Sequence, residues 1–323
     1  MEPQIRYAKT SDGVNIAYFT MGEGPPLVHL PPPFPHLQLE WEVPEMRSWC
    51  ERLAASHQLV KFDPRGFGLS DRDAKVTELD DWGTDLDAIV DKLNLDEFAL
   101  LAMTTAAPAA IAYATKHPDR VSSLVLVSGI IRWQDIQVQS QVASARALID
   151  VDWELYSETI ASSVFGWEGG QQARRLATLI RASTEPDRLK LFMAAAETWD
   201  VGDLLPQVTS PTLLLHQRDA PYPKVEVQRE LAAAIPNARL SLQEGSSFFP
   251  FFGDMDPMLN AIQEFLGVGA KAESSEARGG FHTILFTDVE GSTALTERLG
   301  DAKARTLLRE HERITRDATA APR

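Results

Sequence analysis

Two adjacent threonines, Thr104 and Thr105, stand between the apolar run FALLAM and the helical pattern AAPAAIAYATKHP. A threonine hydroxyl becomes a nucleophile only when a neighbouring base removes its proton, and near neutral pH that base is usually a histidine. Of the histidines in the sequence, we expect His36 and His216 to lie nearest to this position, although a local hydrogen bond is the commoner role for each. The pattern therefore predicts either nucleophilic chemistry at Thr104 or a turn that joins a strand to a helix.

The order of apolar runs predicts the elements that position these residues. Short β-rich runs separated by the turn sequences SDG and GEG indicate an antiparallel start. Buried-strand runs then alternate with helical patterns, which predicts a mostly parallel sheet covered by helices on both faces. Because loops at the strand ends converge in such a sheet, we expect any chemistry to lie there.

A long helical stretch interrupts this alternation between the runs VSSLVLVSG and SPTLLLH. It is far longer than an ordinary connection, so we predict a helical cap over residues 130–208. The cap contains Trp133, Trp153, Trp167 and Trp199. These side chains either line a pocket or fill the cap's own core, and the core is the commoner place for aromatic residues at helical spacing.

Charge and composition exclude several classes of function. The formal net charge of -15 disfavours binding to nucleic acid or to an anionic membrane surface through a basic face. The single cysteine, Cys50, has no partner for an internal disulfide. The N-terminus lacks an apolar signal core, and no apolar stretch is long enough to span a bilayer. We therefore expect a cytoplasmic protein with no nucleic-acid or membrane partner.

Three blocks of sequence, in order, resemble the α/β-hydrolase fold family over residues 3–267. They are FDPRGFGLSD, LDEFALLAMTTAAPAAIAYATKHPDRVSSLVLVSG and SPTLLLHQRDAPYP. The resemblance implies an α/β fold with a mostly parallel eight-stranded sheet, helices on both faces and a helical cap. It also assigns residues 1–267 to one domain.

The resemblance places residues of this chain at the family's catalytic positions. The family motif G-x-S-x-G corresponds here to Ala102–Ala106, with Met103 before Thr104 and Thr104 at the nucleophile position. Phe248 stands where the family has its histidine base, and phenylalanine cannot accept a proton. Asp219 occupies the acid position, where an aspartate orients that histidine. Without the histidine, Asp219 either forms a turn or binds a ligand, and the turn is the favoured role.

The oxyanion-binding position is altered as well. The resemblance implies one backbone N–H donor at Thr105 and a second in the loop that contains Pro32 and Pro33. Proline has no N–H to donate, and loss of one such donor typically lowers the rate by about a hundredfold or more. Phe249 and its neighbouring phenylalanines would make the pocket apolar. Together these changes argue against ordinary ester hydrolysis.

The C-terminal part reads as a linker, 268–280, followed by a second segment, 281–323. Its string FTDVEGSTALTERLG resembles the opening of a class III adenylyl or guanylyl cyclase domain, and Asp288 matches a metal-ligand position of that family. We therefore expect an incomplete α+β cyclase fragment, with Mg²⁺ or Mn²⁺ bound only in an intact cyclase parent and no cofactor for the hydrolase-like domain. The fragment itself is not expected to make cyclic nucleotides.

Three functions remain open at this stage. The favoured hypothesis is a degenerate hydrolase-like domain that binds a small apolar ligand and regulates a cyclase domain of the same chain. A second is an active hydrolase or esterase that uses Thr104 as its nucleophile. A third is a structural module that dimerises, so that a homodimer forms without any ligand.

Overall fold

The computed structural model describes residues 2–31, 34–74, 76, 78–136, 144–165, 170–247 and 249–267, all of which belong to one unit of the chain, Met1–Lys271. The predicted linker 268–280 and the cyclase-like segment 281–323, with Asp288, lie outside these residues. Pro32, Pro33, Trp167 and Phe248 lie outside them as well.

An eight-stranded sheet forms the centre of the described part, in the order β1-β2-β4-β3-β5-β6-β7-β8. The sheet is mixed, because β2 pairs antiparallel with both β1 and β4 while the pairs from β4 to β8 are parallel. This arrangement agrees with the predicted antiparallel start and mostly parallel continuation. The strands are β1 (Arg6–Lys9), β2 (Asn15–Met21), β3 (Pro26–Leu30), β4 (Gln58–Phe62), β5 (Phe98–Met103), β6 (Val121–Val127), β7 (Thr212–Gln217) and β8 (Ala238–Gln243).

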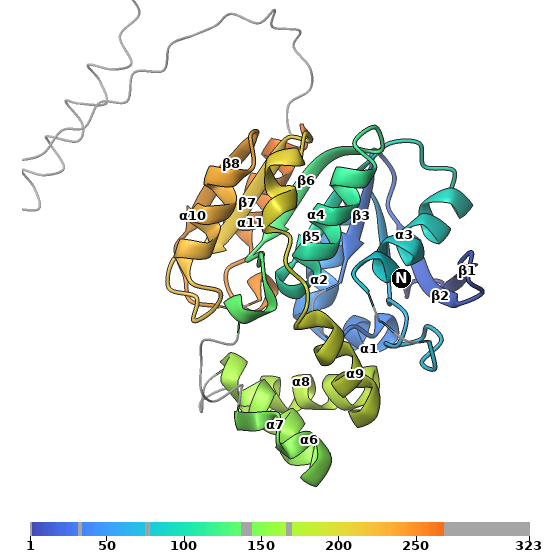
Figure 1. Ribbon diagram of the computed structural model, residues 1–323, viewed down its shortest axis with the longest axis vertical. Coiled ribbons are helices and arrows are strands. Elements are labelled where there is room, and N and C mark those ends of the chain that lie inside the picture. Colours follow the sequence, from blue (N-terminus) through green and yellow to red (C-terminus); the bar gives the residue numbers. More distant parts are fainter. Residues whose placement is uncertain are drawn as a thin grey trace, which may run out of the picture. The chain divides into compact units, whose positions relative to one another are not determined.

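Helices cover both faces of the sheet (Figure 1). One face carries α3 (Asp80–Lys92), α4 (Ala107–Lys116) and α10 (Val225–Ala234), and the other carries α2 (Pro44–Ala54) and α11 (Asp256–Phe265). Every residue of β5 and β7 is buried as a result. This double burial is the physical reason why FALLAM and most of TLLLHQ are continuous apolar runs and do not alternate with polar residues.

A group of helices lies between β6 and β7 in the sequence and forms the cap, seen below the sheet in Figure 1. It contains α6 (Leu148–Val151), α7 (Trp153–Phe165), α8 (Gly170–Ser183) and α9 (Pro186–Ala196), with the short turns η2 (Trp133–Asp135) and η3 (Gly202–Gln207) on either side. The remaining elements are α1 (Leu37–Glu42), η1 (Thr104–Ala106) and η4 (Pro250–Phe252).

Buried charges hold the loop after β4, whose sequence is DPRGFGLSD. The Asp63 carboxylate accepts hydrogen bonds from the backbone N–H of Leu37 (3.1 Å) and of Leu69 (2.8 Å). Burial raises the pKa of Asp63 to about 7, although the bond from Leu69 opposes the shift. A glycine is required at position 68, because φ is +55° there and a Cβ atom would lie 2.1 Å from Asp63 Oδ2.

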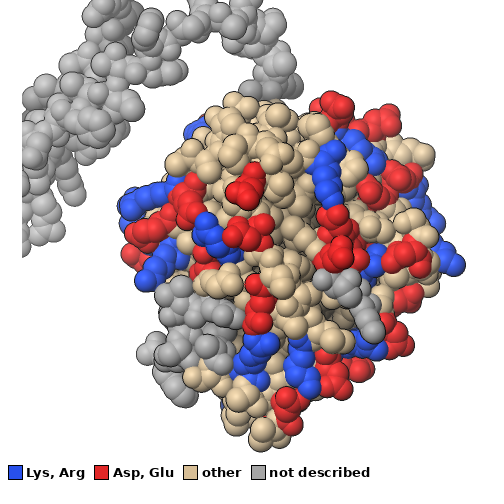
Figure 2. All heavy atoms as spheres, in the orientation of Figure 1, with Lys and Arg blue, Asp and Glu red and all other residues tan. Residues whose placement is uncertain are grey.

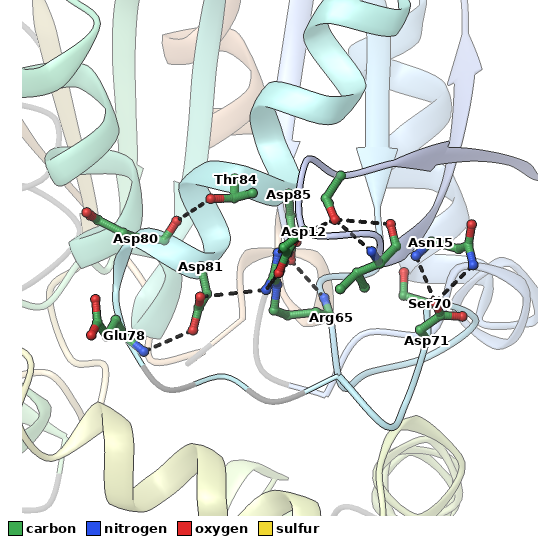
Figure 3. Close-up of polar contacts among 12 residues, drawn as sticks. Asp12, Asn15, Arg65, Ser70, Asp71, Glu78, Asp80, Asp81, Thr84 and Asp85 are labelled. Carbon is green, nitrogen blue, oxygen red and sulfur yellow. Dashed lines mark hydrogen bonds and ion pairs between the residues drawn. The ribbon is translucent and has the colours of Figure 1, made fainter.

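The same loop is joined to the rest of the fold by Arg65, drawn at the centre of Figure 3. Its guanidinium pairs with Asp12 before β2 (2.7 Å) and with Asp85 of α3 (2.8 Å), and Asp81 lies 3.6 Å away. Burial raises the pKa of Asp85 to about 6, and the pairing with Arg65 opposes that shift. The motif DPRGFGLSD is therefore part of the scaffold.

The surface shows no broad field of one charge on the face drawn in Figure 2, where acidic and basic side chains alternate. Within the part of the chain that the structure describes, no helix has both the length and the apolar character needed to cross a bilayer.

Candidate functional site

Thr104 lies at a sharp turn between β5 and α4. Its φ is +48°, a conformation uncommon for any residue except glycine and especially so for a β-branched side chain. The side chain is fully buried, and Oγ1 has no hydrogen-bond partner among the described residues. The strand-to-helix turn implied by the resemblance is thus present, but no side chain of the described residues lies within hydrogen-bond reach of its hydroxyl.

His36 and His216 both make hydrogen bonds elsewhere. His36 is the N-cap of α1, where its Nδ1 accepts the N–H of Leu39 at 3.3 Å. Burial, together with the charge of Arg72, lowers its pKa. His216 is fully buried at the end of β7, and burial lowers its pKa to about 4. The structure therefore gives each of these histidines the local role, and neither is hydrogen-bonded to Thr104.

Ser128 is a hydroxyl that sequence reasoning missed. It follows β6, has φ of +49°, and its Oγ lies 3.1 Å from His216 Nδ1. The strand register aligns Met103 with Val127 and Val127 with Leu215, so the next residues, Thr104, Ser128 and His216, form a row across three strands. Ser128 and His216 are both buried, and neither is among the described residues that line the cavity beneath the cap.

Asp219, at the acid position, is exposed in the turn after β7. Its backbone N–H donates to the carbonyl of Gly245 at 3.0 Å, which ties the turn to the loop before Phe248. The buried side chain of Gln217 holds the same loop by accepting the N–H of Ser247 at 2.6 Å. These contacts give Asp219 a turn-forming role, and no histidine of the described residues bonds to it.

The other predicted site residues divide between the core and the cavity. Met103 is buried within β5, whereas Thr105 and Phe249 line a cavity beneath the cap. Thr105 Oγ1, like that of Thr104, has no hydrogen-bond partner among the described residues. Because Pro32, Pro33 and Phe248 lie outside those residues, their predicted roles stay predictions.

The cavity has a volume of about 110 Å³ and lies between the strand-end loops and the cap. Phe34, Phe67 and Trp82 line it from the hydrolase-like body, and Trp133, Tyr156 and Phe192 from the segment between β6 and β7. No charged side chain is among the described residues that line it. Such walls favour a neutral apolar molecule, because a buried charge would find no partner there.

Phe192 of α9 is the centre of an aromatic cluster that joins the cap to the body. Its ring centroid lies 5.2 Å from that of Phe67, 5.6 Å from Trp199, and 5.9 Å from both Trp82 and Trp133. Aromatic pairs at these distances stabilise by about 0.5–1.5 kcal/mol beyond the area they bury. The sequence left open whether the cap tryptophans line a pocket or fill a core. Trp133 does both, and Trp199 packs in the core.

No cluster of three or more histidine, cysteine, aspartate or glutamate side chains suited to a metal ion occurs within the described ranges.

Comparison with protein families gives a match to the alpha/beta hydrolase fold over residues 43–254. The chain belongs to the α/β hydrolase fold family. The family assignment made from the three sequence blocks is thereby confirmed, and the cap, sheet and strand-end turn described above are features of this α/β hydrolase fold. The cyclase resemblance of residues 281–323 finds no support in the comparison.

Curated relatives of this α/β hydrolase fold chain are hydrolases and esterases. A 2-hydroxy-6-oxononadienedioate/2-hydroxy-6-oxononatrienedioate hydrolase of Cupriavidus pinatubonensis is 26% identical over 227 residues, which cover 67% of this chain and 78% of the relative. A pimeloyl-acyl-carrier-protein methyl ester esterase of Legionella pneumophila is 23% identical over 227 residues, which cover 66% of this chain and 86% of the relative.

Solved structures show the same fold. The esterase RhEst1 of a Rhodococcus species has a TM-score of 0.70 at 24% identity, covering 83% of this chain and 99% of its own. A hydrolase from Pseudomonas aeruginosa has a TM-score of 0.69 at 19% identity, covering 82% of this chain and 98% of its own. At these identities the likeness concerns the α/β hydrolase fold alone.

Proposed function

We propose that this member of the α/β hydrolase fold family binds a small apolar ligand in the cavity beneath its cap and does not hydrolyse esters by a nucleophile–histidine mechanism. The observation that carries the proposal is the isolation of the Thr104 hydroxyl. A nucleophilic hydroxyl requires a base within about 2.6–3.2 Å, and Thr104 Oγ1 has no hydrogen-bond partner among the described residues. The sequence adds a phenylalanine, Phe248, at the position of the family's base.

The proposal extends to regulation of a nucleotide cyclase. Its only support is the string FTDVEGSTALTERLG, which resembles the start of a class III cyclase domain. In this proposal, occupation of the cavity controls a cyclase domain in the same chain, and the divalent metal belongs to that domain. The hydrolase-like part itself is proposed to work without a cofactor.

A second candidate function is an active esterase with Thr104 as its nucleophile. The names of the relatives favour it, because those relatives are hydrolases and esterases. This function requires a base within reach of Thr104. The described histidines whose side chains form hydrogen bonds are bonded to Trp49, Leu39, Ser56 and Ser128, and none of these bonds involves Thr104. The third reading, a dimerising module without ligand, is disfavoured by the cavity, since a purely structural domain would be expected to fill that space.

The test is hydrolysis of a short-chain nitrophenyl ester series by the full chain and by Thr104→Val. Valine keeps the branched shape and removes the hydroxyl, and Thr105→Val is the matched control one residue away. We expect all three proteins to hydrolyse the esters at the same background rate. A rate that collapses in Thr104→Val while Thr105→Val keeps it would establish the esterase instead.

A further inference from the structure

Two buried indole N–H groups belong to the wall of the aromatic cavity and have no hydrogen-bond partner among the described residues. They are those of Trp82 in α3, which is 3% exposed, and of Trp133 in η2, which is 8% exposed. Each ring centroid lies 5.9 Å from that of Phe192, so the two indoles pack against the same ring, one from the body and one from the segment between β6 and β7. Because proteins pair most of their buried donors, two unpaired donors on one cavity wall indicate that a bound molecule completes their hydrogen bonding.

A third donor on the same wall is the hydroxyl of Tyr156, which comes from α7 of the cap. This side chain is 3% exposed, and its hydroxyl forms no hydrogen bond with a described residue. Burial raises the pKa of Tyr156, so the hydroxyl keeps its proton at neutral pH. The cap's other described hydroxyl on this wall, that of Ser163, already donates to the carbonyl of Ile160 at 2.7 Å. The cap therefore contributes one hydroxyl that is available to a ligand.

The chemistry of these donors defines the group that would pair with them. An indole N–H can only donate, so its partner must be an acceptor. No charged side chain is among the described residues that line the cavity, and a carboxylate or phosphate would therefore be buried there without a counter-charge. A carbonyl or ether oxygen accepts hydrogen bonds and carries no charge, so it meets both conditions.

The size and walls of the cavity limit the rest of the molecule. An apolar cavity of about 150 Å³ admits benzene, so a cavity of about 110 Å³ suits a somewhat smaller ring. Eight of the eighteen described residues that line it are aromatic, and their flat faces favour a compact ring over a flexible chain.

We propose that the ligand is a small neutral ring compound whose carbonyl or ether oxygen accepts hydrogen bonds from this set of donors, Trp82, Trp133 and Tyr156. This inference rests on the proposed function, because the ligand occupies the same cavity. The ring itself contacts the apolar walls, and the oxygen replaces the hydrogen bonds that the ketone or ether loses on leaving water. A carbonyl oxygen has two lone pairs, so it accepts from one or two of the three donors at a time.

The experiment compares cyclopentanone with methylenecyclopentane, in which a CH₂ group replaces the oxygen and the shape is kept. Dissociation constants for both compounds are measured by calorimetry on the full wild-type chain and on Tyr156→Phe, Trp82→Phe and Trp133→Phe, each of which removes one donor. The ratio of the two constants within one protein cancels any general change in the cavity.

Two further variants are controls. Trp199→Phe removes an indole of the same aromatic cluster whose N–H is also unpartnered, but Trp199 is not among the described residues that line the cavity. Tyr7→Phe removes a hydroxyl from β1, at a side chain that is 49% exposed.

We expect the preference for cyclopentanone over methylenecyclopentane to fall by about three- to tenfold in at least one of the three donor variants and to stay at the wild-type value in both controls. If both compounds bind and the preference is the same in wild type and in all three donor variants, the inference is overturned, while the apolar site of the proposed function remains. If neither compound binds to wild type, the proposed function fails, and the inference with it.

Discussion

Replacement of Thr104 by glycine should make the protein more stable, although it removes a fully buried side chain. A non-glycine residue held in the left-handed region costs about 1–3 kcal/mol, and Thr104 is held there at φ +48°. Its hydroxyl is also buried without a partner, and removing such a group recovers about 1 kcal/mol. Against this, glycine loses about 0.5–1 kcal/mol in chain entropy, and the two lost carbon atoms, Cβ and the methyl group, cost about 1.6 kcal/mol together.

The balance for Thr104→Gly is therefore a gain of about 0.5 kcal/mol, or about 1–2 °C in melting temperature for a domain of this size. Thr105→Gly is the matched control. Thr105 is also buried with an unpartnered hydroxyl, but it has no positive φ, so its replacement relieves no backbone strain.

Urea unfolding of both variants measures the strain directly. We expect Thr104→Gly to be more stable than Thr105→Gly by about 1–3 kcal/mol, which is the backbone cost at position 104. Equal loss of stability in both variants would refute the reasoning, because it would mean that Thr104 holds its conformation without cost.

Three further predictions concern the scaffold around the cavity. Gly68→Ala should lower the free energy of unfolding by more than about 2 kcal/mol, because a Cβ would lie 2.1 Å from the Asp63 carboxylate. Gly267→Ala also has a positive φ but open space around it, so it should lower the free energy of unfolding by only about 1 kcal/mol. Burial raises the pKa of Asp63 from 3.8 to about 7, so the folded state binds protons more tightly than the unfolded state between these pH values. The free energy of unfolding should therefore fall as the pH rises from about 4 to about 7. Asp63→Asn should make this dependence of stability on pH shallower in urea titrations at several pH values. Phe192→Ala should lower the free energy of unfolding by about 3–5 kcal/mol, because it empties the centre of the aromatic cluster. Leu191→Ala removes a side chain that is 47% exposed on the same helix and should lower it by less than about 1 kcal/mol. Comparable losses in the two variants would contradict the central position of Phe192 in the cluster.

The sequence predicts the scaffold well because the relevant signals are local. FALLAM followed by TTAAP predicts a buried strand that turns into a helix, and the structure has β5, η1 and α4 there. The family motif around Thr104 corresponds to the same position. A continuous apolar run needs only that both faces of the sheet be covered, which the alternation of strands and helices already indicates.

Contacts between distant segments could not be predicted in this way. Ser128 and His216 are 88 residues apart, and the sequence VSG around Ser128 carries no motif that announces a partner. The polar face of α8 is visible in the periodicity of Gln171, Arg174 and Thr178, but the sequence does not say that α1 lies opposite this face. The first pairing depends on the order and register of the strands, and the second on how the cap packs against the body, and no short pattern encodes either.

In the proposed function, the cavity holds an apolar molecule without acting on it. The most direct test adds a saturating nitrophenyl ester to the full chain and records tryptophan emission and nitrophenolate release in the same sample. We predict a saturable change in emission with the ester recovered intact over many binding lifetimes. Release of nitrophenolate that follows the same saturation curve and disappears in Thr104→Val would contradict the claim and identify the chain as an esterase.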